Sequence, residues 1–302
     1  MLKPQGRNME STQVRNAEVS EIRYGSQEIE KYYRQSQVDY RLLWSFHRSH
    51  SLHYGFWSES TRNLSEALER ENGVLARMAG IHSQDVVLDA GCGVGGSAIY
   101  LAENLGCRVR GVSLCDHQLQ RARRLVRTKQ VEHLVDFEHG DYHVLTHPDE
   151  SFSVIWCIES FCHSWNKSLF LREAFRLLKP GGILIIADGF EANKALDESE
   201  SKLMRSWLDG WAVPDLLSPS EMQSRALHAG FGQMDFRDVT SSVQRSSRKL
   251  YNYATLFSPA ARIASFLGLR RATLNGNLRA ARDQYLALRA NLWQYGVFRA
   301  WK

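Results

Sequence analysis

Strand-length runs of residues alternate with helical patterns through the middle of the chain. Five such runs stand at residues 86–88, 108–112, 135–138, 152–157 and 183–187, separated by turns and by amphipathic helical patterns. A parallel strand buried on both faces is continuously apolar, and its alternation with helices is typical of a doubly wound α/β sheet. In that architecture, ligands bind at the carboxyl ends of the strands. The pattern therefore predicts a parallel sheet with a site at one edge.

Helical patterns flank this core on both sides. The spacing of Ile29, Tyr33 and Tyr40 predicts a helix from Gln27, and Leu64, Leu68, Leu75 and Met78 mark an amphipathic helix. Residues 190–217 carry Trp207 and Trp211 and are expected to form part of a lid, and residues 218–230 a capped helix. Two further strands are expected at 231–239 and 295–301, with mostly helix between them.

These patterns divide the chain into five predicted segments. They are a mobile or partner-ordered arm at 1–25, a helical substrate cap at 26–80, a core at 81–240, a helical insertion or lid at 241–293, and a last core strand at 294–302. The arm is polar and has no apolar period, which is why we expect it to be ordered only by a partner. Assembly with further copies of the same chain is the corresponding expectation.

Composition narrows the class of protein. The 302 residues, of which 43% are hydrophobic, suffice for one large core with additions. No run of about eighteen apolar residues is free of charge and the N-terminus lacks a signal-peptide pattern, so we expect a cytoplasmic protein without a transmembrane segment. The five cysteines are odd in number and lie in predicted strands and turns. They favour reduced thiols over a disulfide framework or a metal site.

The net charge of +5 is unevenly distributed. Eleven Lys and Arg residues stand after Ser241 against one acid, Asp283. Arginine offers forked donors that suit a diphosphate, although a solvated helix face or a subunit contact explains the same charge. The arginines are interleaved with apolar helix positions and no recognition motif is present, so nucleic acid is not an expected partner.

The glycine-rich turn after the first strand is the strongest candidate for a binding site. The chain passes from Leu88 and Asp89 through Gly91, Gly93 and Gly95 into a helix. Glycines remove the Cβ atoms that would hold a ligand off the backbone, and a helix start presents free N–H groups. A tight crossover turn without a ligand remains the alternative for the pattern alone.

The run Val87–Gly96 and the segments up to Asp188 resemble the core of the class I S-adenosylmethionine-dependent methyltransferases, and within them the sterol, prenyl diphosphate and tocopherol methylating group. The resemblance implies a Rossmann-like doubly wound seven-stranded sheet with a reversed last strand, N-terminal helices and a helical lid. It also implies S-adenosylmethionine as the cofactor. Asp89, Gly91, Gly93 and Gly95 would hold its methionine end.

Further cofactor contacts follow from the same resemblance. Asp141 would accept the adenine amine and Tyr142 would border the base. The second strand ends in Ser113 where many relatives carry an acid for the ribose, so Ser113 or Gln118 is expected to bind it as an uncharged partner. Asp116 lies nearby and is a further candidate for the ribose, although at the opening of the following helix it is expected to be the N-cap.

The run Ile158–His163 resembles the corresponding segment of sterol methyltransferases and makes Glu159 the candidate catalytic carboxylate, with Tyr54 and His163 beside it. An alkene that takes a methyl group becomes a carbocation, which must be shielded and deprotonated. A capping or ion-pairing role for Glu159 and a packing role for His163 are the alternatives. The expected substrate pocket holds six further aromatic or imidazole residues and one arginine: Trp44, Phe46, His53, Trp57, Phe161, Trp165 and Arg41.

Three functions remain open at this stage. The first is C-methylation of an isoprenoid alkene, either a prenyl diphosphate with Mg²⁺ as a conditional cofactor or a terpenoid, prenylated or sterol-like product. The second is O- or N-methylation of a small molecule with His163 as base. The third is a partner protein that binds the cofactor without turnover. No resident metal site is expected.

Overall fold

The computed structural model describes residues 25–43, 51, 53–266 and 272–302. Its centre is a seven-stranded sheet in the order β3-β2-β1-β4-β5-β7-β6. The strands are β1 (Val86–Ala90), β2 (Arg108–Ser113), β3 (Val135–His139), β4 (Phe152–Ile158), β5 (Leu178–Glu191), β6 (Gln233–Asp238) and β7 (Trp293–Trp301). β7 runs antiparallel to both β5 and β6, whereas β1 to β5 are parallel. The strand order reverses between β1 and β4, which is where such sheets bind ligands.

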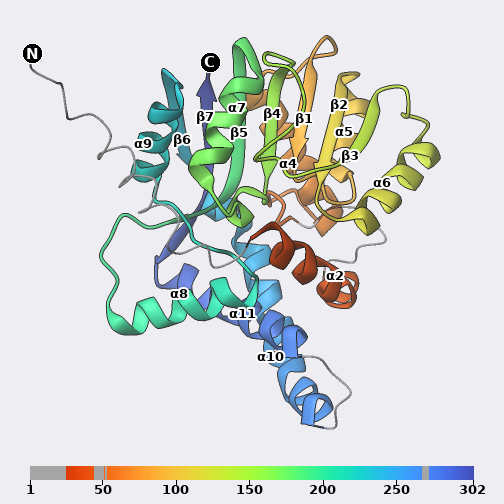
Figure 1. The fold of residues 1–302 in the computed structure, drawn as a ribbon. Coiled ribbons are helices and arrows are strands. Elements are labelled where there is room, and N and C mark those ends of the chain that lie inside the picture. Colours follow the sequence, from red (N-terminus) through yellow and green to blue (C-terminus); the bar gives the residue numbers. More distant parts are fainter. Residues whose placement is uncertain (1–24, 44–50, 52, 267–271) are drawn as a thin grey trace, which may run out of the picture.

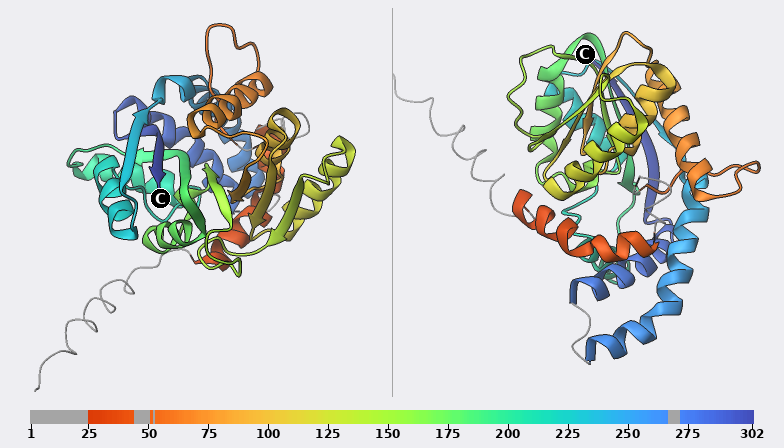
Figure 2. Two further views of the ribbon diagram at one scale, coloured as in Figure 1. Left: turned by 90° about the horizontal axis from the view of Figure 1, so that it is seen from above. Right: turned by 90° about the vertical axis from the view of Figure 1, so that its right-hand side faces the viewer.

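Helices cover both faces of the sheet (Figures 1 and 2). α4 (Leu64–Ala79), α5 (Gly96–Leu105) and α6 (Asp116–Lys129) pack on one face, in the hydrophobic cluster that contains Leu75, Leu101 and Trp156. α7 (Lys167–Leu177) and α9 (Pro219–Ala229) pack on the other face, in the cluster that contains Phe170 and Ile155. Because β1 and β4 are buried on both sides, their apolar runs are nearly unbroken.

A second group of helices gathers at the carboxyl end of the parallel strands, below the sheet in Figure 1. These are α2 (Ser26–Leu43), α8 (Glu198–Gly210), α10 (Thr240–Phe266) and α11 (Ala272–Arg289), with the short 3₁₀ turn η1 (Phe161–His163). α11 packs against α2, α8 and α10. The Tyr32 hydroxyl donates to Asn277 at 2.9 Å and Ser206 donates to Asp283 at 2.6 Å. The helices therefore form one cap over the end of the sheet.

The predicted fold class is confirmed, including the reversed last strand. The capped helix after Ser218 and the mostly helical stretch between the last two strands also appear where the patterns place them. The expected lid region contains α8, and its role as a lid stays a prediction. One local prediction is wrong: Asp116 is the first helical residue of α6 and Cys115 is its N-cap. Of the five segments, the arm at 1–25 lies almost wholly outside the described residues, and the functional boundaries stay predictions. Within the described residues, no helix has the length and apolar character needed to cross a bilayer.

Candidate active site

A pocket of about 1500 Å³, counted with its solvent-open mouth, lies at the carboxyl ends of the parallel strands. β1, β2, β4 and β5 contribute Asp89, Ser113, Ile158 and Asp188 to its floor. The cap contributes residues of α2 and α8, among them Trp207. The pocket therefore joins the glycine turn after β1 to a chamber beneath the cap.

Two residues of the glycine turn are open to this pocket. Gly91 and Gly93 have φ values of 90° and 54°, in the left-handed region that favours glycine. A Cβ on Gly93 would meet no atom within 4 Å and would enter the pocket space, whereas a Cβ on Gly91 would collide with Ser160. The backbone at Gly93 thus leaves room for a ligand that a side chain would fill.

Asp89 and Ser97 supply unsatisfied polar atoms at the same place. Asp89 Oδ2 and Ser97 Oγ are buried, line the pocket and have no hydrogen-bond partner. Burial raises the pKa of Asp89 to about 7, and the charge of His53 opposes that rise. A buried acceptor without a donor is costly unless a ligand completes it. The amino-acid end of S-adenosylmethionine carries the ammonium group that such a carboxylate requires.

Gly95 has a different role from the one expected. It is the N-cap of α5 with a φ of 82°, and it does not line the pocket. A Cβ at this position would come within 2.5 Å of the Phe137 ring. Gly95 therefore allows α5 to approach β3, and its contact with the cofactor is not supported.

Ser113 and Gln118 lie together on the pocket wall. Ser113 Oγ accepts from the Cys115 amide at 3.1 Å and donates to Gln118 Oε1 at 3.3 Å. Their position at the end of β2 is the one the prediction gives to the ribose site. The pair is uncharged, and its hydroxyl and amide groups are suited to sugar hydroxyls.

Asp141 lines the pocket, and its carboxylate accepts hydrogen bonds from four described donors. Its Oδ1 accepts from the backbone and the Nδ1 of His143, and its Oδ2 accepts from Ser26 Oγ at 2.5 Å and from Trp165 Nε1 at 3.1 Å. Burial opposes ionisation, but the bonds and charge of His143 and the Ser26 bond bring the pKa well below its usual range. The carboxylate therefore ties α2 to the loops after β3 and η1. An adenine amine would have to join or displace these donors.

Tyr142 stands beside Asp141. Its hydroxyl donates to the Ser160 carbonyl at 2.9 Å and its ring packs edge-on against Phe170. The ring also lies on the pocket wall. This placement is compatible with the predicted contact to the base, which stays a prediction.

Glu159 is a half-buried residue directly after β4. Its backbone has a φ of 47°, an uncommon value for a residue with a side chain and a conformation that surrounding contacts must impose. Oε1 accepts from the Tyr54 amide at 2.7 Å and from the Tyr295 hydroxyl at 2.9 Å. Burial, opposed by the His53 charge and reinforced by Glu71, raises its pKa well above the usual range. Glu159 lines the pocket, so a carboxyl group faces the ligand space.

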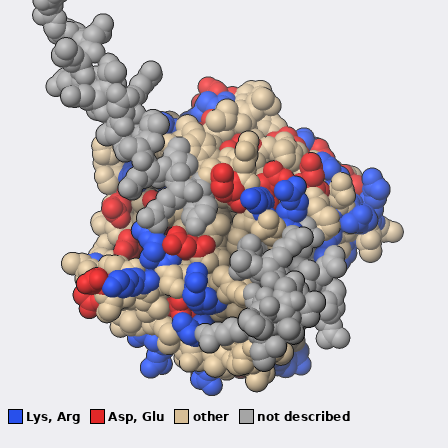
Figure 3. Space-filling model, turned by 60° about the horizontal axis from the view of Figure 1, so that its bottom comes forward, with Lys and Arg blue, Asp and Glu red and all other residues tan. Residues whose placement is uncertain are grey.

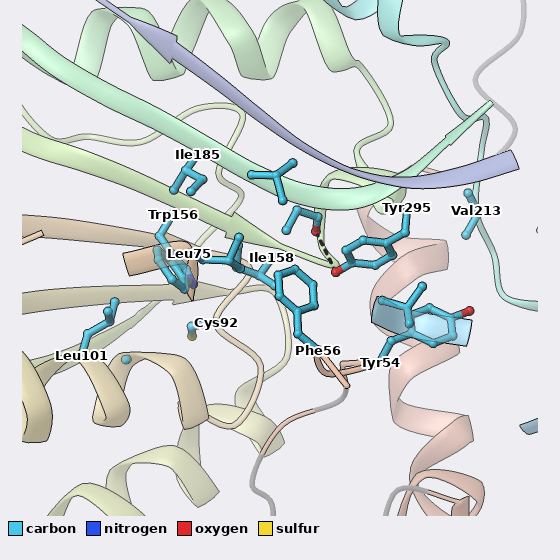
Figure 4. Packing of buried hydrophobic residues seen from close by; sticks show 14 of the residues in the cluster. Tyr54, Phe56, Leu75, Cys92, Leu101, Trp156, Ile158, Ile185, Val213 and Tyr295 are labelled. Carbon is cyan, nitrogen blue, oxygen red and sulfur yellow. Dashed lines mark hydrogen bonds between the residues drawn. The ribbon is translucent and has the colours of Figure 1, made fainter. Parts of the chain in front are cut away.

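Aromatic and imidazole side chains surround the chamber beside Glu159. The wall contains Tyr32, His53, Tyr54, His163, Trp165, Trp207, Trp211 and Trp293. The Tyr54 hydroxyl donates to Gln284 at 3.2 Å, and its ring packs edge-on against Tyr295 with centroids 5.9 Å apart. Figure 4 shows Tyr54, Phe56 and Tyr295 together. The chamber is therefore suited to an apolar ligand and to shielding a positive charge.

His163 is held neutral in this wall. Its Nδ1 faces the Ala212 carbonyl at 3.3 Å, and because a carbonyl only accepts, Nδ1 carries the hydrogen. Burial, opposed by the Ala212 bond, lowers the pKa of His163 to about 4. At neutral pH the ring is therefore an uncharged imidazole.

Two expected pocket residues lie elsewhere. Trp57 donates from Nε1 to Ser246 at 2.7 Å, and Arg245 and Lys249 lie 4.2 and 4.3 Å from its ring centre. Phe161 belongs to the hydrophobic cluster on the opposite face of the sheet. Neither residue lines the pocket. Trp44, Phe46 and the side chain of Arg41 lie outside the described residues.

The basic C-terminal stretch does not reach the pocket within the described residues. Arg245 and Lys249 are on the outer face of Trp57, and Arg279, Arg282 and Arg289 are exposed on α11. Basic and acidic side chains are interspersed on the face in Figure 3. The described lining holds Glu30, Asp89, Asp141, Glu159 and Asp188 but no Lys or Arg. No metal-binding cluster of His, Cys, Asp or Glu occurs in the described part of the chain.

The structure adds two residues that the sequence analysis missed. Glu71 on α4 is fully buried, and its Oε1 accepts from the Tyr295 hydroxyl at 3.1 Å. Glu71 occupies the apolar stripe of its helix, three residues after Leu68 and four before Leu75. An acid on the apolar stripe of a helix is the sequence feature that could have identified Glu71 as a candidate site residue. Tyr295 had no such signal, because a tyrosine in a core strand is ordinary.

The chain resembles methyltransferases in sequence and in structure. Residues 88–186 match the family described as "Methyltransferase domain". The 27-O-demethylrifamycin SV methyltransferase of Amycolatopsis mediterranei is 32% identical over 66% of this chain and 73% of that enzyme. The glycine/sarcosine/dimethylglycine N-methyltransferase of Actinopolyspora halophila is 29% identical over 69% of this chain, but this chain spans only 36% of that protein.

A solved structure shares the fold over nearly the whole chain. The geranyl diphosphate C-methyltransferase of Streptomyces coelicolor A3(2), in complex with Mg²⁺, geranyl diphosphate and S-adenosyl-L-homocysteine, has a TM-score of 0.69. It covers 94% of this chain and 98% of its own at 17% identity. At that identity the likeness concerns the fold.

Proposed function

We propose, on the premise that this chain belongs to the class I S-adenosylmethionine-dependent methyltransferases, that it methylates an alkene carbon of a neutral isoprenoid: a terpenoid, or a prenylated or sterol-like compound. The observation that carries the proposal is the position of Glu159. Its half-buried side chain lines the same pocket as the glycine turn, beside aromatic side chains.

Several of the chain's residues fit the cofactor. Asp89 and Ser97 offer unsatisfied acceptors, Gly93 leaves open space, and Ser113 with Gln118 offers uncharged partners for the ribose. When bound, S-adenosylmethionine supplies a methyl group on a positively charged sulfur, so the acceptor needs no prior activation if it is an alkene. The protein's task is to align the acceptor and exclude water.

Glu159 performs the remaining chemistry. As the new C–C bond takes the alkene's π electrons, positive charge develops on the neighbouring carbon. Burial raises the pKa of Glu159, but the positive charges of the bound cofactor and of the developing cation favour its ionised form, which stabilises the cation. Glu159 then accepts a proton from the adjacent carbon, and the C–H electron pair becomes the new double bond. We propose that the ring of Tyr54, which lines the pocket, shields the cation from solvent.

The charge of the pocket favours a neutral acceptor over a diphosphate. The described lining carries five acids and no Lys or Arg, so it offers none of the cations that a diphosphate needs. Arg41 lies on α2, where its side chain is not described. The diphosphate alternative therefore depends on residues beyond the described lining, and so does Mg²⁺.

A second candidate function is O- or N-methylation with His163 as base. The position of His163 in the pocket wall favours it, because imidazole is the most common general base, although burial lowers the pKa of His163 to about 4 and so makes it a weak base at pH 7. The rifamycin relative acts, by its name, on an oxygen. The two functions differ in the atom that receives the methyl group.

The experiment is product analysis with isotopically labelled S-adenosylmethionine. The purified chain is incubated with neutral terpenoids, prenylated aromatics and sterols, and in parallel with prenyl diphosphates and their free alcohols. We expect label on carbon in a neutral acceptor. Label on oxygen or nitrogen supports the second candidate, faster turnover of a diphosphate than of its alcohol supports the charged acceptor, and cofactor binding without product supports an inactive partner protein.

A further inference from the structure

Behind Glu159 lies a buried chain of titratable groups that the proposed reaction does not yet use. The Tyr295 hydroxyl is 2.9 Å from Glu159 Oε1 and 3.1 Å from Glu71 Oε1. Glu71 Oε2 in turn lies 3.6 Å from His53 Nδ1, and neither of these two buried atoms has a hydrogen-bond partner. The order Glu159, Tyr295, Glu71, His53 thus joins the candidate base to an imidazole at the pocket wall.

The hydroxyl of Tyr295 has one proton for two carboxyl groups. Ionised carboxylates only accept, so Tyr295 can donate to one of them and must accept from the other, which is then a carboxylic acid. The ring cannot turn away, because it is fully buried between Tyr54 and Phe56, with ring centroids 5.9 and 6.1 Å from theirs (Figure 4). The geometry therefore holds a single proton shared across Tyr295.

His53 connects this chain to a second cavity. His53 and Tyr54 line both the main pocket and a smaller cavity of about 570 Å³, which is also bounded by Leu64, Lys249 and Tyr253. The His53 side chain keeps 14% of its exposure, whereas Glu71 is fully buried. Burial acts to lower the pKa of His53, but Glu71, with Glu159 and Asp89, outweighs it and raises the pKa to about 9. His53 is thus the last group before the outer cavity.

We infer that Tyr295, Glu71 and His53 form a proton relay that returns Glu159 to its ionised form after each methyl transfer. The inference rests on the proposed function, because it requires Glu159 to take a proton from the substrate. At rest Glu159 is ionised and Glu71 carries the shared carboxylic proton. After methyl transfer the Glu71 proton leaves through the His53 imidazole to the solvent, the Tyr295 proton passes to Glu71, and the proton on Glu159 passes to the Tyr295 oxygen. The net change is the loss of one proton from Glu159 to the solvent. No oxidant or reductant is involved.

The relay gives the base a route by which to lose its proton. Burial raises the pKa of Glu159 well above its usual range, so this carboxyl group gives up a proton slowly unless a neighbouring group takes it. Tyr295, Glu71 and His53 are positioning and transfer groups, and Glu159 is the residue that meets the substrate. Loss of the relay should therefore slow the reset of the enzyme and spare its first turnover.

The test is rapid-quench kinetics with the best neutral acceptor from the product analysis. Tyr295→Phe keeps the ring but removes the hydroxyl, and Glu71→Gln keeps the shape but removes the ionisable group. After equilibration, each variant should form one product per enzyme at a rate within about twofold of the parent, followed by a steady state at least tenfold slower, a loss within the range of a positioned proton-transfer group. Tyr285→Phe, at a stacked tyrosine between α10 and α11, is the matched control and should leave both phases unchanged.

Other outcomes are equally decisive. A steady state like that of the control in Tyr295→Phe overturns the relay, and so does an equal fall in both phases, which would mean that Tyr295 only positions Glu159. If Glu159→Gln retains the first-turnover burst, the proposed function fails instead. Infrared difference spectra of the substrate-free protein give an activity-independent readout: the carboxylic C=O band should shift in Tyr295→Phe, and an unchanged band contradicts the shared proton.

Discussion

Replacing Asp89 by asparagine should stabilise the protein without cofactor and weaken cofactor binding at the same time. Asp89 is buried, its Oδ2 has no hydrogen-bond partner, and burial, against the His53 charge, raises its pKa to about 7. The folded protein therefore either retains a proton on Asp89 or buries an unpaired charge. Asparagine has a similar shape and never ionises, so the variant avoids both penalties.

The size of the effect follows from the two pKa values. The carboxyl group titrates at 3.8 in its reference state and at about 7 in the folded protein. Between these values the folded state binds more protons than the unfolded state, so stability falls as the pH rises. With about 1.4 kcal/mol per pKa unit, the penalty is about 1.5 kcal/mol at pH 5 and about 4 kcal/mol at pH 8. The advantage of Asp89→Asn should grow by about 2.5 kcal/mol over this interval.

Chemical denaturation of the cofactor-free variants at pH 5 and pH 8 measures this difference. Glu132→Gln changes an exposed acid and should show no such pH dependence. Calorimetry with S-adenosylmethionine should give an affinity at least tenfold weaker for Asp89→Asn, about the value of one charged hydrogen bond. A stability difference that is equal at both pH values would refute the buried unpaired carboxyl, and an unchanged affinity would remove Asp89 from the cofactor site.

Three further variants test other parts of the site. Gly93→Val should abolish cofactor binding in calorimetry, because its side chain fills pocket space. Gly181→Val is the control: Gly181 also has a positive φ but is exposed, so this variant should bind the cofactor normally. Equal losses in both variants would contradict the assignment of Gly93 to the cofactor site. Asp141→Ala should weaken cofactor binding and speed amide exchange in α2, since Ser26 loses its acceptor; unchanged exchange would show that this bond does not hold α2. Trp57→Ala should lower the unfolding free energy by roughly 3–5 kcal/mol, while KM for the acceptor stays constant. A changed KM at constant stability would show that Trp57 does line the substrate pocket.

The fold was predictable because its signals are local. β1 and β4 are nearly unbroken apolar runs before a turn, and Ser218 with Glu221 forms the capping box that their spacing indicates. Asp89, Gly93 and Glu159 are close in sequence to strand ends, so the topology alone carries them to one edge.

The rest of the site depends on long-range packing. Tyr295 meets Glu159 from 136 residues away and Glu71 from 224, distances over which no local pattern operates. Trp57 was assigned to the pocket because aromatic residues cluster around it, but it points to α10, where Ser246, Arg245 and Lys249 satisfy it. An aromatic cluster in a connecting segment has two sides, and the sequence does not say which one faces the ligand.

The most direct test of the central claim is the turnover of Glu159→Gln on the neutral acceptor, measured beside its affinity for S-adenosylmethionine. Glutamine keeps the shape and the acceptor oxygen for the Tyr54 amide but lacks charge and basicity. Cofactor affinity should hold, and turnover should fall by roughly two to four orders of magnitude, as for loss of a positioned base. A turnover within about threefold of the parent, less than such a base contributes, would contradict carbon methylation through Glu159.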